Sequence, residues 1–377
     1  MKSIDWKNLP SCYFSNTKNV SKLTLVIVAV CGIYVLFTMF NSSQAEQHLD
    51  LSSFVLQNNY TDELQCTENI TLTQANQFQK LFSKNIMWSG CYANDYLEKL
   101  YLADLNIQHR QKKLFFDVGA NKGYTIASWL ATWMPDMKID PKSLHVYLSQ
   151  TLNITDCGAC LDCNEKVPNI SDKINRLGTT MEIHAFEPMS TTFQALLQVR
   201  THFNISRLFV NQLAASNTTG MAMMNKCPVG VEICGFESID HPVTNETAFS
   251  LPTITLDDYV QHKKIKQTID LLKIDTEGAD PLVLLGAKNL FLQQQIRMLI
   301  FENHGIGVWR TTSLLEVIQS LNNNGFTCHM VGKTGMMRLT NCWSPVYDIK
   351  NWSNILCVHR REVHLRRFLD ELLIIDI

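Results

Sequence analysis

Polar residues stand directly after several apolar runs, at the points where buried strands would end. The first group spans residues 117–123 and contains Asp117, Gly119 and Gly123 behind the apolar run 114–116. Glycines between a strand and a helix let the backbone approach a bound molecule and aim the helix N-terminus at it. The pattern predicts a ligand-binding turn, although a glycine pair alone also occurs in purely structural turns.

A second acid favours the ligand-binding interpretation. Glu187 closes the apolar run 183–186, and a carboxylate there can accept hydrogen bonds from both hydroxyls of a ribose. Glu187 follows Gly119 by 68 residues, whereas roughly 20 are expected in a dinucleotide-binding unit. We therefore predict a surface insertion at about 136–178, between the first two strands and outside the core.

Two further groups carry ionisable side chains suited to acid–base chemistry. Asp275 and Glu277 follow the apolar run 269–274, and Glu302 and His304 follow the run 298–301. Histidine titrates near neutral pH and is a common general base. The alternative for Asp275 and Glu277 is that they cap the helix that begins near Pro281.

These groups need a scaffold, and the apolar runs predict one. Seven runs have the length and composition of buried strands: 114–118, 183–186, 208–210, 269–274, 298–301, 326–331 and 355–358. Helix-like segments separate the first five, among them 125–132, 191–201 and 280–292. This alternation predicts a parallel sheet covered on both faces. The last two runs lack a helical pattern between them and predict an antiparallel pair at one edge.

Four segments together resemble the FkbM-type methyltransferase family: 117–123, 186–188, 254–258 and 269–278, the last followed by Leu282 to Ala287. The resemblance covers about residues 112–305. It implies an α/β class I methyltransferase fold, Rossmann-like, with a seven-stranded, mostly parallel sheet and an antiparallel edge. It also implies S-adenosylmethionine as the cofactor and hydroxyl groups, often on sugars, as acceptors.

The resemblance implies roles for individual residues. The methionine and ribose portions of the cofactor would be held by Asp117, Gly119, Ala120, Asn121 and Gly123, and the ribose hydroxyls by Glu187. Ala214 and Ala215, expected with Ser216 to end the third strand, would line the adenine.

The catalytic candidates are Asp275, Glu277, Glu302 and His304, because methyl transfer to a hydroxyl requires removal of a proton. We expect His304 or Asp275 to be the base and Glu277 to orient the sugar. No ligand spacing indicates a metal. Trp309 and Trp343 could stack on a sugar ring, with ordinary packing as the alternative.

The N-terminal region predicts a membrane anchor. Residues 23–40, from Leu23 to Phe40, are 18 residues without a charge, enough for about 27 Å of helix. Four lysines precede this run, so we expect a cytosolic tail at 1–22, a signal-anchor at 23–40, a luminal stem at 41–84 and an FkbM-like domain at 85–377. A cleaved signal peptide is the alternative, but its apolar core is usually about 7–15 residues.

Sequons and cysteines agree with a luminal domain. Nine Asn-X-Ser/Thr triplets follow the run 23–40, starting at Asn41, Asn59, Asn69, Asn153, Asn169, Asn204, Asn217, Asn245 and Asn351. Ten cysteines also follow it, an even number typical of oxidising compartments. Zinc binding by Cys157, Cys160 and Cys163 would need a fourth ligand, so disulfides are favoured. Other expected pairs are Cys227 with Cys234, and Cys328 with Cys342 or Cys357.

The net charge of −2 and the absence of a long basic run argue against nucleic acid as a partner. The predicted function is therefore that of a type II membrane protein of the Golgi whose luminal domain methylates a hydroxyl of a glycan acceptor. One alternative is a non-catalytic binding or trafficking protein of the secretory pathway with the same fold. Another is a cytosolic enzyme acting on small metabolites.

Overall fold

The computed structural model describes residues 66–82, 112–158, 160–164, 180–225, 248–333 and 335–373. All of them belong to one unit, Asp50–Ile377. The predicted tail, the predicted anchor at 23–40 and most of the predicted stem lie outside these ranges. Within them, no helix has the length and apolar character needed to cross a membrane.

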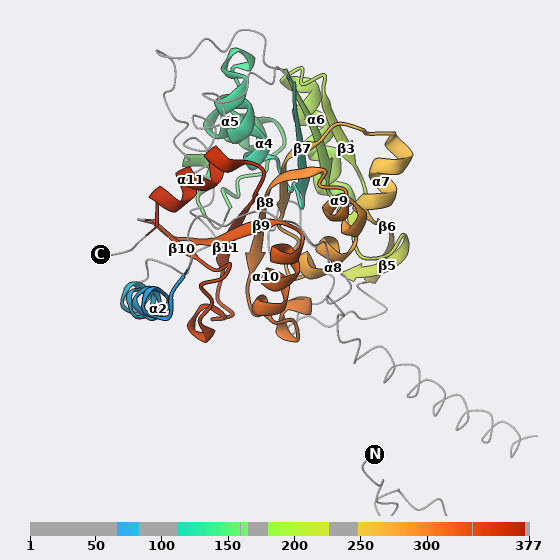
Figure 1. Ribbon diagram of the computed structural model, residues 1–377. Helices are drawn as coiled ribbons and strands as arrows, with labels where there is room; N and C mark the ends of the chain where they lie inside the picture. Colours follow the sequence, from blue (N-terminus) through green and yellow to red (C-terminus); the bar gives the residue numbers. More distant parts are fainter. Residues whose placement is uncertain are drawn as a thin grey trace, which may run out of the picture. The chain divides into compact units, whose positions relative to one another are not determined.

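The central sheet has the strand order β10-β9-β11-β8-β7-β1-β2-β3 (Figure 1). Its strands are β1 Lys112–Val118, β2 Thr180–Phe186, β3 Leu208–Asn211, β7 Ile269–Ile274, β8 Ile296–Asn303, β9 Phe326–Val331, β10 Met336–Arg338 and β11 Ser353–His359. Strands β3, β2, β1, β7 and β8 run parallel to one another. The order reverses at β1, between β2 and β7, and ligands of open α/β sheets bind at such a switch point.

All seven predicted strands form, and the sheet is mostly parallel as expected. The predicted antiparallel pair also forms, because β11 runs antiparallel to β9. However, β11 lies between β8 and β9 and is antiparallel to both. The short strand β10 adds an eighth strand at the edge; three residues are too few to show a sequence pattern.

Helices cover both faces of this sheet (Figure 1). One face carries α7 Leu256–Lys263, α8 Asp280–Leu285, α9 Lys288–Leu292 and α10 Leu314–Asn323. The other carries α4 Tyr124–Trp133, α5 Pro141–Thr151, α6 Ser190–His202 and α11 Val363–Glu371. Strand β8 shows the division: Leu299 and Phe301 join the first core, and Met298 and Ile300 the second. Strands buried on both faces explain the continuous apolar runs.

Two predicted elements have different limits. The helix predicted at 280–292 is divided into α8 and α9, because Gly286 packs against the backbone of Ser216, where a Cβ would lie 2.0 Å from the Ser216 carbonyl oxygen. Ala214 and Ala215 do not end the third strand, which stops at Asn211. They form β4 in a second sheet of order β4-β6-β5, with β5 Gly220–Asn225 and β6 Ala248–Ile254.

The predicted insertion lies between α4 and β2 and contains η4 Pro135–Met137, α5 and η5 Asp162–Asn164. It contributes to the core, because Leu144 and Leu148 of α5 are fully buried with α4 and α6. Cys157 pairs with Cys163, and Cys160 is also disulfide-bonded. These cysteines therefore form disulfides, which the sequence favoured over a zinc site.

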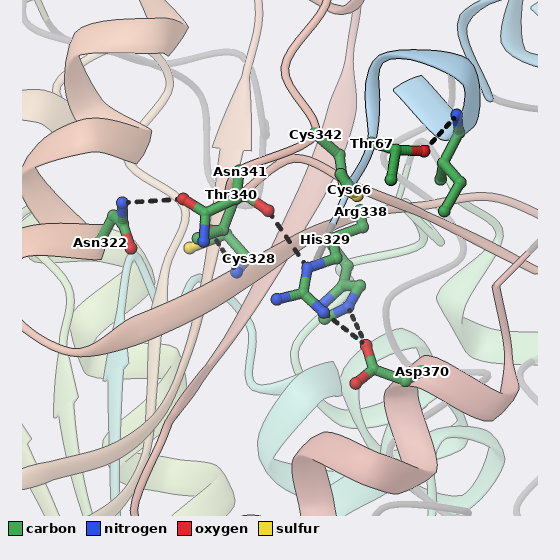
Figure 2. Close-up of a disulfide and its surroundings, with 11 residues drawn as sticks. Cys66, Thr67, Asn322, Cys328, His329, Arg338, Thr340, Asn341, Cys342 and Asp370 are labelled. Atoms are coloured by element: carbon green, nitrogen blue, oxygen red, sulfur yellow. Dashed lines mark hydrogen bonds and ion pairs between the residues drawn. A yellow bond between two sulfur atoms is a disulfide. The ribbon is translucent and has the colours of Figure 1, made fainter. Parts of the chain in front are cut away.

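Part of the predicted stem is a helix that packs on the domain. Helix α2, Glu68–Phe82, follows a disulfide between Cys66 and Cys342, and Phe78 packs edge-to-face on Tyr347 at 5.0 Å. Figure 2 shows this disulfide near the ion pair of the buried Arg338 with Asp370. The folded unit therefore begins before residue 85.

Cysteine pairing follows the strand register. Cys328 and Cys357 face each other on β9 and β11 and are bonded, which decides between the two partners expected for Cys328. The expected pair of Cys227 and Cys234 lies outside the described residues.

A buried ion triad joins the amino ends of the central strands. Arg297 of β8 contacts Asp270 of β7 and Glu362, each at 2.7 Å, and the second oxygen of Asp270 accepts the amide of Leu114 in β1. Each buried charge here has an opposite partner, as burial requires. The triad holds β1, β7 and β8 together at the edge opposite the predicted site.

Candidate functional site

The loops that follow β1, β7 and β8 touch through their backbones. Gly119 has φ +87°, and a Cβ there would lie 1.7 Å from the carbonyl oxygen of Asp275. Gly278, with φ +106°, meets Gly307, and the amide of Val308 donates to the Gly278 carbonyl at 2.9 Å. The structure thus brings the three predicted groups together at the carboxyl ends of the parallel strands.

The glycines of the first loop make room for protein atoms. Gly119 accommodates Asp275, and a Cβ on Gly123, which has φ +92°, would lie 2.8 Å from a methyl carbon of Leu196. Both glycines had been expected to allow the close approach of a ligand. Their contacts show that they are needed for loop and helix packing even before a ligand is considered.

Glu187 connects the first two loops. Its carboxylate accepts the amide of Asn121 at 3.0 Å and the amide of Met189 at 2.9 Å. The Phe186 carbonyl accepts the amides of Gly119 and Ala120. Burial raises the pKa of Glu187 to about 7, although the two amides oppose the shift. A carboxylate has about four acceptor positions, so about two remain for a ligand.

Lys273 lies between two of the predicted acids. Its ammonium contacts Asp117 at 3.4 Å and Asp275 at 3.0 Å. Asp117 is fully buried, and burial raises its pKa against the opposing effect of Lys273. The Asp275 side chain is 31% exposed and can reach a ligand. Lys273 was not among the predicted site residues, although a lysine near the end of a mostly apolar run was the available signal.

Asp280 is a second missed residue. Its carboxylate accepts the hydroxyl of Thr276 at 2.8 Å and the amide of Glu302 at 3.2 Å, and thereby joins the loop after β7 to the end of β8. The N-cap residue of helix α8 is Ala279, so neither Asp275 nor Glu277 occupies that position. Burial, with charge repulsion from Asp275 and Glu277, raises the pKa of Glu302 well above its usual range.

His304 is fully buried at the end of β8. Its Nδ1 accepts the amide of Ile306 at 3.4 Å, so the neutral ring carries its proton on Nε2. Burial lowers the pKa of His304 to about 4, partly opposed by the nearby carboxylate of Asp275. At neutral pH the ring is therefore uncharged and presents an Nε2–H donor.

The insertion supports the first loop. Lys122, fully buried, forms an ion pair at 2.8 Å with Asp156, which adjoins the disulfide-bonded Cys157. The hydroxyl of Tyr124 lies 2.8 Å from Nδ1 of His145 in α5. The insertion is therefore a structural neighbour of residues 117–123 and not a remote surface loop.

The remaining predicted residues lie in packed surroundings. Ala214 packs with Met189, whose amide binds Glu187, and Ala215 belongs to the main core. Trp309 is fully buried and stacks on Phe301, while Trp343 packs edge-to-face on Tyr347. Packing, the alternative to sugar stacking, therefore holds for both tryptophans.

Several buried polar atoms at this edge have no hydrogen-bond partner in the part of the chain that the structure describes. They are Oδ2 of Asp117, Oδ1 of Asn121, both side-chain polar atoms of Asn303 and Nε2 of His304. Buried polar groups normally have partners, so such a group points to a bound molecule. The same described ranges contain no cluster of three or more His, Cys, Asp or Glu side chains arranged to hold a metal.

Comparison with known families identifies residues 117–328 as matching the family described as "Methyltransferase FkbM domain". Comparison with curated protein sequences finds no match.

Solved structures similar to this chain include a METTL16 methyltransferase domain (crystal form 2), with 10% identity, a TM-score of 0.35, and coverage of 85% of this chain and 91% of that one. Another is human methyltransferase 10 domain containing protein, with 9% identity, a TM-score of 0.30, and coverage of 70% and 81%. Scores this low define neither fold nor function, which are inferred from the strand order and the family match.

The close contact between Gly119 and Asp275 predicts that a methyl group added at Gly119 destabilises the fold. Gly119→Ala should lower the free energy of unfolding by about 3 kcal/mol or more, because the Cβ overlaps a carbonyl and φ is positive. Urea denaturation of the purified chain measures the change. Gly220→Ala is the control, since no atom lies within 4 Å of a Cβ there, and it should change stability by less than about 0.5 kcal/mol. Equal effects of the two variants would contradict the packing role of Gly119.

Proposed function

The chain belongs to the FkbM methyltransferase family, and we propose that it transfers a methyl group from S-adenosylmethionine to a sugar hydroxyl on a glycan. Unsatisfied buried polar atoms of Asp117, Asn121 and His304 at the switch point of the sheet carry this proposal. They lie at the carboxyl ends of β1 and β8 and in the loop after β1, where a cofactor and an acceptor could meet.

The residues at this edge fit the proposed cofactor. Oδ2 of Asp117 and Oδ1 of Asn121 offer acceptors for amino and hydroxyl groups, and Glu187 retains acceptor positions for the ribose. Gly119, Ala120 and Gly123 form the turn beside them, and Ala214 and Ala215 remain the proposed adenine contacts. When bound, S-adenosylmethionine supplies an electrophilic methyl group on a sulfonium.

We assign the base to Asp275. His304 Nε2 already carries the proton of the neutral ring, so it can donate a hydrogen bond to the acceptor oxygen but cannot accept a proton there. Burial and the nearby carboxylates raise the pKa of Glu302 well above its usual range, which favours its neutral form. Asp275 would take the hydroxyl proton of the acceptor, while the cofactor, held by Asp117, Asn121 and Glu187, would supply the methyl group. Glu277 is proposed to orient the sugar.

This assignment predicts a selective loss of turnover. Asp275→Asn keeps the shape of the side chain but removes the base, so kcat should fall about 100-fold or more with cofactor affinity retained. The measurement uses the purified chain, S-adenosylmethionine with a labelled methyl group and a panel of glycans.

Asp136→Asn, at an exposed position in η4, is the matched control and should keep full activity. Absence of transfer by the unaltered chain to every glycan, together with no cofactor binding, would reject the proposed function. Full activity of Asp275→Asn would reject only the assignment of Asp275 as the base and would leave the proposed function standing.

The raised pKa of Glu187 predicts how the affinity for the cofactor depends on pH. Ribose hydroxyls donate to the ionised carboxylate, whereas the protonated form has less acceptor capacity. With a pKa of about 7, ionisation rises from about one tenth at pH 6 to about nine tenths at pH 8, so affinity should increase about ninefold over this range. Calorimetric titration with S-adenosylhomocysteine at both pH values measures the change. In Glu187→Gln the difference should disappear, and its persistence would exclude Glu187 as the cause.

The Golgi lumen is the proposed location, with residues 23–40 as a type II anchor. Support comes from the disulfides, which persist in oxidising compartments, and from the exposure of the sequon residues Asn69, Asn153, Asn204 and Asn351.

Glycosidase treatment tests this location. Removal of N-linked glycans should increase the electrophoretic mobility of the chain expressed in animal cells. A variant with these four asparagines changed to glutamine is the control and should shift less. No shift of the unaltered chain would favour the cytosolic alternative.

A further inference from the structure

The antiparallel strand β11 brings its first residues to the site. Ser353 pairs with Asn303, so the preceding residue, Trp352, lies opposite His304. The two rings stack with centroids 5.3 Å apart and an interplanar angle of 24°. Trp352 is 38% exposed, whereas Trp129, Trp133 and Trp309 are buried. An exposed indole therefore stands beside the buried imidazole of the site.

On the basis of the proposed function, we propose that Trp352 is the binding platform for the acceptor, on which a saccharide ring stacks so that a hydroxyl reaches His304 and Asp275. Single exposed apolar residues are common and need no explanation. Trp352 differs because its neighbour His304 is fully buried with an unpartnered Nε2 within the described part of the chain.

The chemistry of the platform matches a saccharide. A sugar ring has apolar C–H faces and a rim of hydroxyls, so it requires an apolar surface with hydrogen-bonding groups at its border. The indole provides the flat apolar surface. The Nε2–H of His304 provides a donor, and the Asp275 carboxylate, near enough to shift the pKa of His304, provides an acceptor.

The backbone before Trp352 is held in place. The ammonium of Lys350 donates to the Thr312 carbonyl, contacts Asp348 at 3.1 Å and lies 5.6 Å from the ring centre of Trp309. A Cβ on Gly305 would lie 3.0 Å from the Lys350 carbonyl oxygen, so this segment packs closely on the loop after β8. A preorganised platform loses less entropy when it binds a ligand.

Three variants of the full chain test the platform. Trp352→Leu removes the aromatic surface, and Trp352→Phe retains part of it. Phe209→Leu is the matched control, because Phe209 is also exposed, at 40%, and also stacks on a buried histidine, His184, but lies on the edge strand β3.

Binding is measured on an immobilised panel of neutral and acidic oligosaccharides with S-adenosylhomocysteine present. The chain is deglycosylated first, because the sequon residue Asn351 adjoins Trp352. We expect Trp352→Leu to weaken binding about tenfold or more, Trp352→Phe to retain most of it, and Phe209→Leu to bind like the unaltered chain. All variants should bind S-adenosylhomocysteine equally.

The platform is overturned if Trp352→Leu binds saccharides normally, or if Phe209→Leu loses as much saccharide affinity as Trp352→Leu. It is also overturned if the unaltered chain binds no saccharide. Methyl transfer is measured separately. If saccharide binding depends on Trp352 but no methyl transfer occurs, the proposed function is rejected and the platform is kept. If methyl transfer occurs and its KM is unchanged in Trp352→Leu, the platform is rejected and the proposed function is kept.

A second measurement does not depend on the folding of a variant. Oxidation of tryptophans by N-bromosuccinimide is mapped by mass spectrometry in the unaltered chain, with and without the best-bound oligosaccharide. The saccharide should slow the oxidation of Trp352 severalfold. Unchanged oxidation of Trp352 at a saturating saccharide concentration would overturn the platform.

Discussion

The site depends on backbone contact between loops that are distant in sequence. Gly119 lies against the carbonyl of Asp275, and Gly278 lies against Gly307, so the loops after β1, β7 and β8 meet without intervening side chains. Hydrogen bonds then fix the side chains: Glu187 holds the amide of Asn121, and Asp280 joins the loop after β7 to the end of β8. Packed backbones position the acids more firmly than flexible side chains could.

Charge is distributed differently at the two ends of the central strands. At the amino ends, Arg297 is bound by Asp270 and Glu362 in a closed triad. At the carboxyl ends, Lys273 faces an excess of acids, and burial and mutual repulsion raise the pKa of Glu302 and Asp280. A cationic ligand would favour ionisation of these carboxyl groups, and the sulfonium and amino groups of the proposed cofactor carry positive charge.

Strand direction determines which residues reach the site. Parallel strands bring their carboxyl ends to it, which is why Asp117, Glu187 and Asp275 gather there. The antiparallel β11 instead brings the residue before its start, and so Trp352 stacks on His304. The insertion adds a second unexpected neighbour, because Asp156 pairs with the buried Lys122.

The sequence alone predicted the central strands and the gathering of the polar residues that follow them. The apolar run 298–301 lies within β8, because strands buried on both faces leave a continuous apolar pattern. The polar residues that follow such runs meet because parallel strands share one edge. Tertiary structure alone decided the partners: Cys66 with Cys342, helix α2 on Tyr347, Ala214 in a second sheet, and Trp352 on His304. These contacts depend on strand order, register and long-range packing, which local periodicity does not encode.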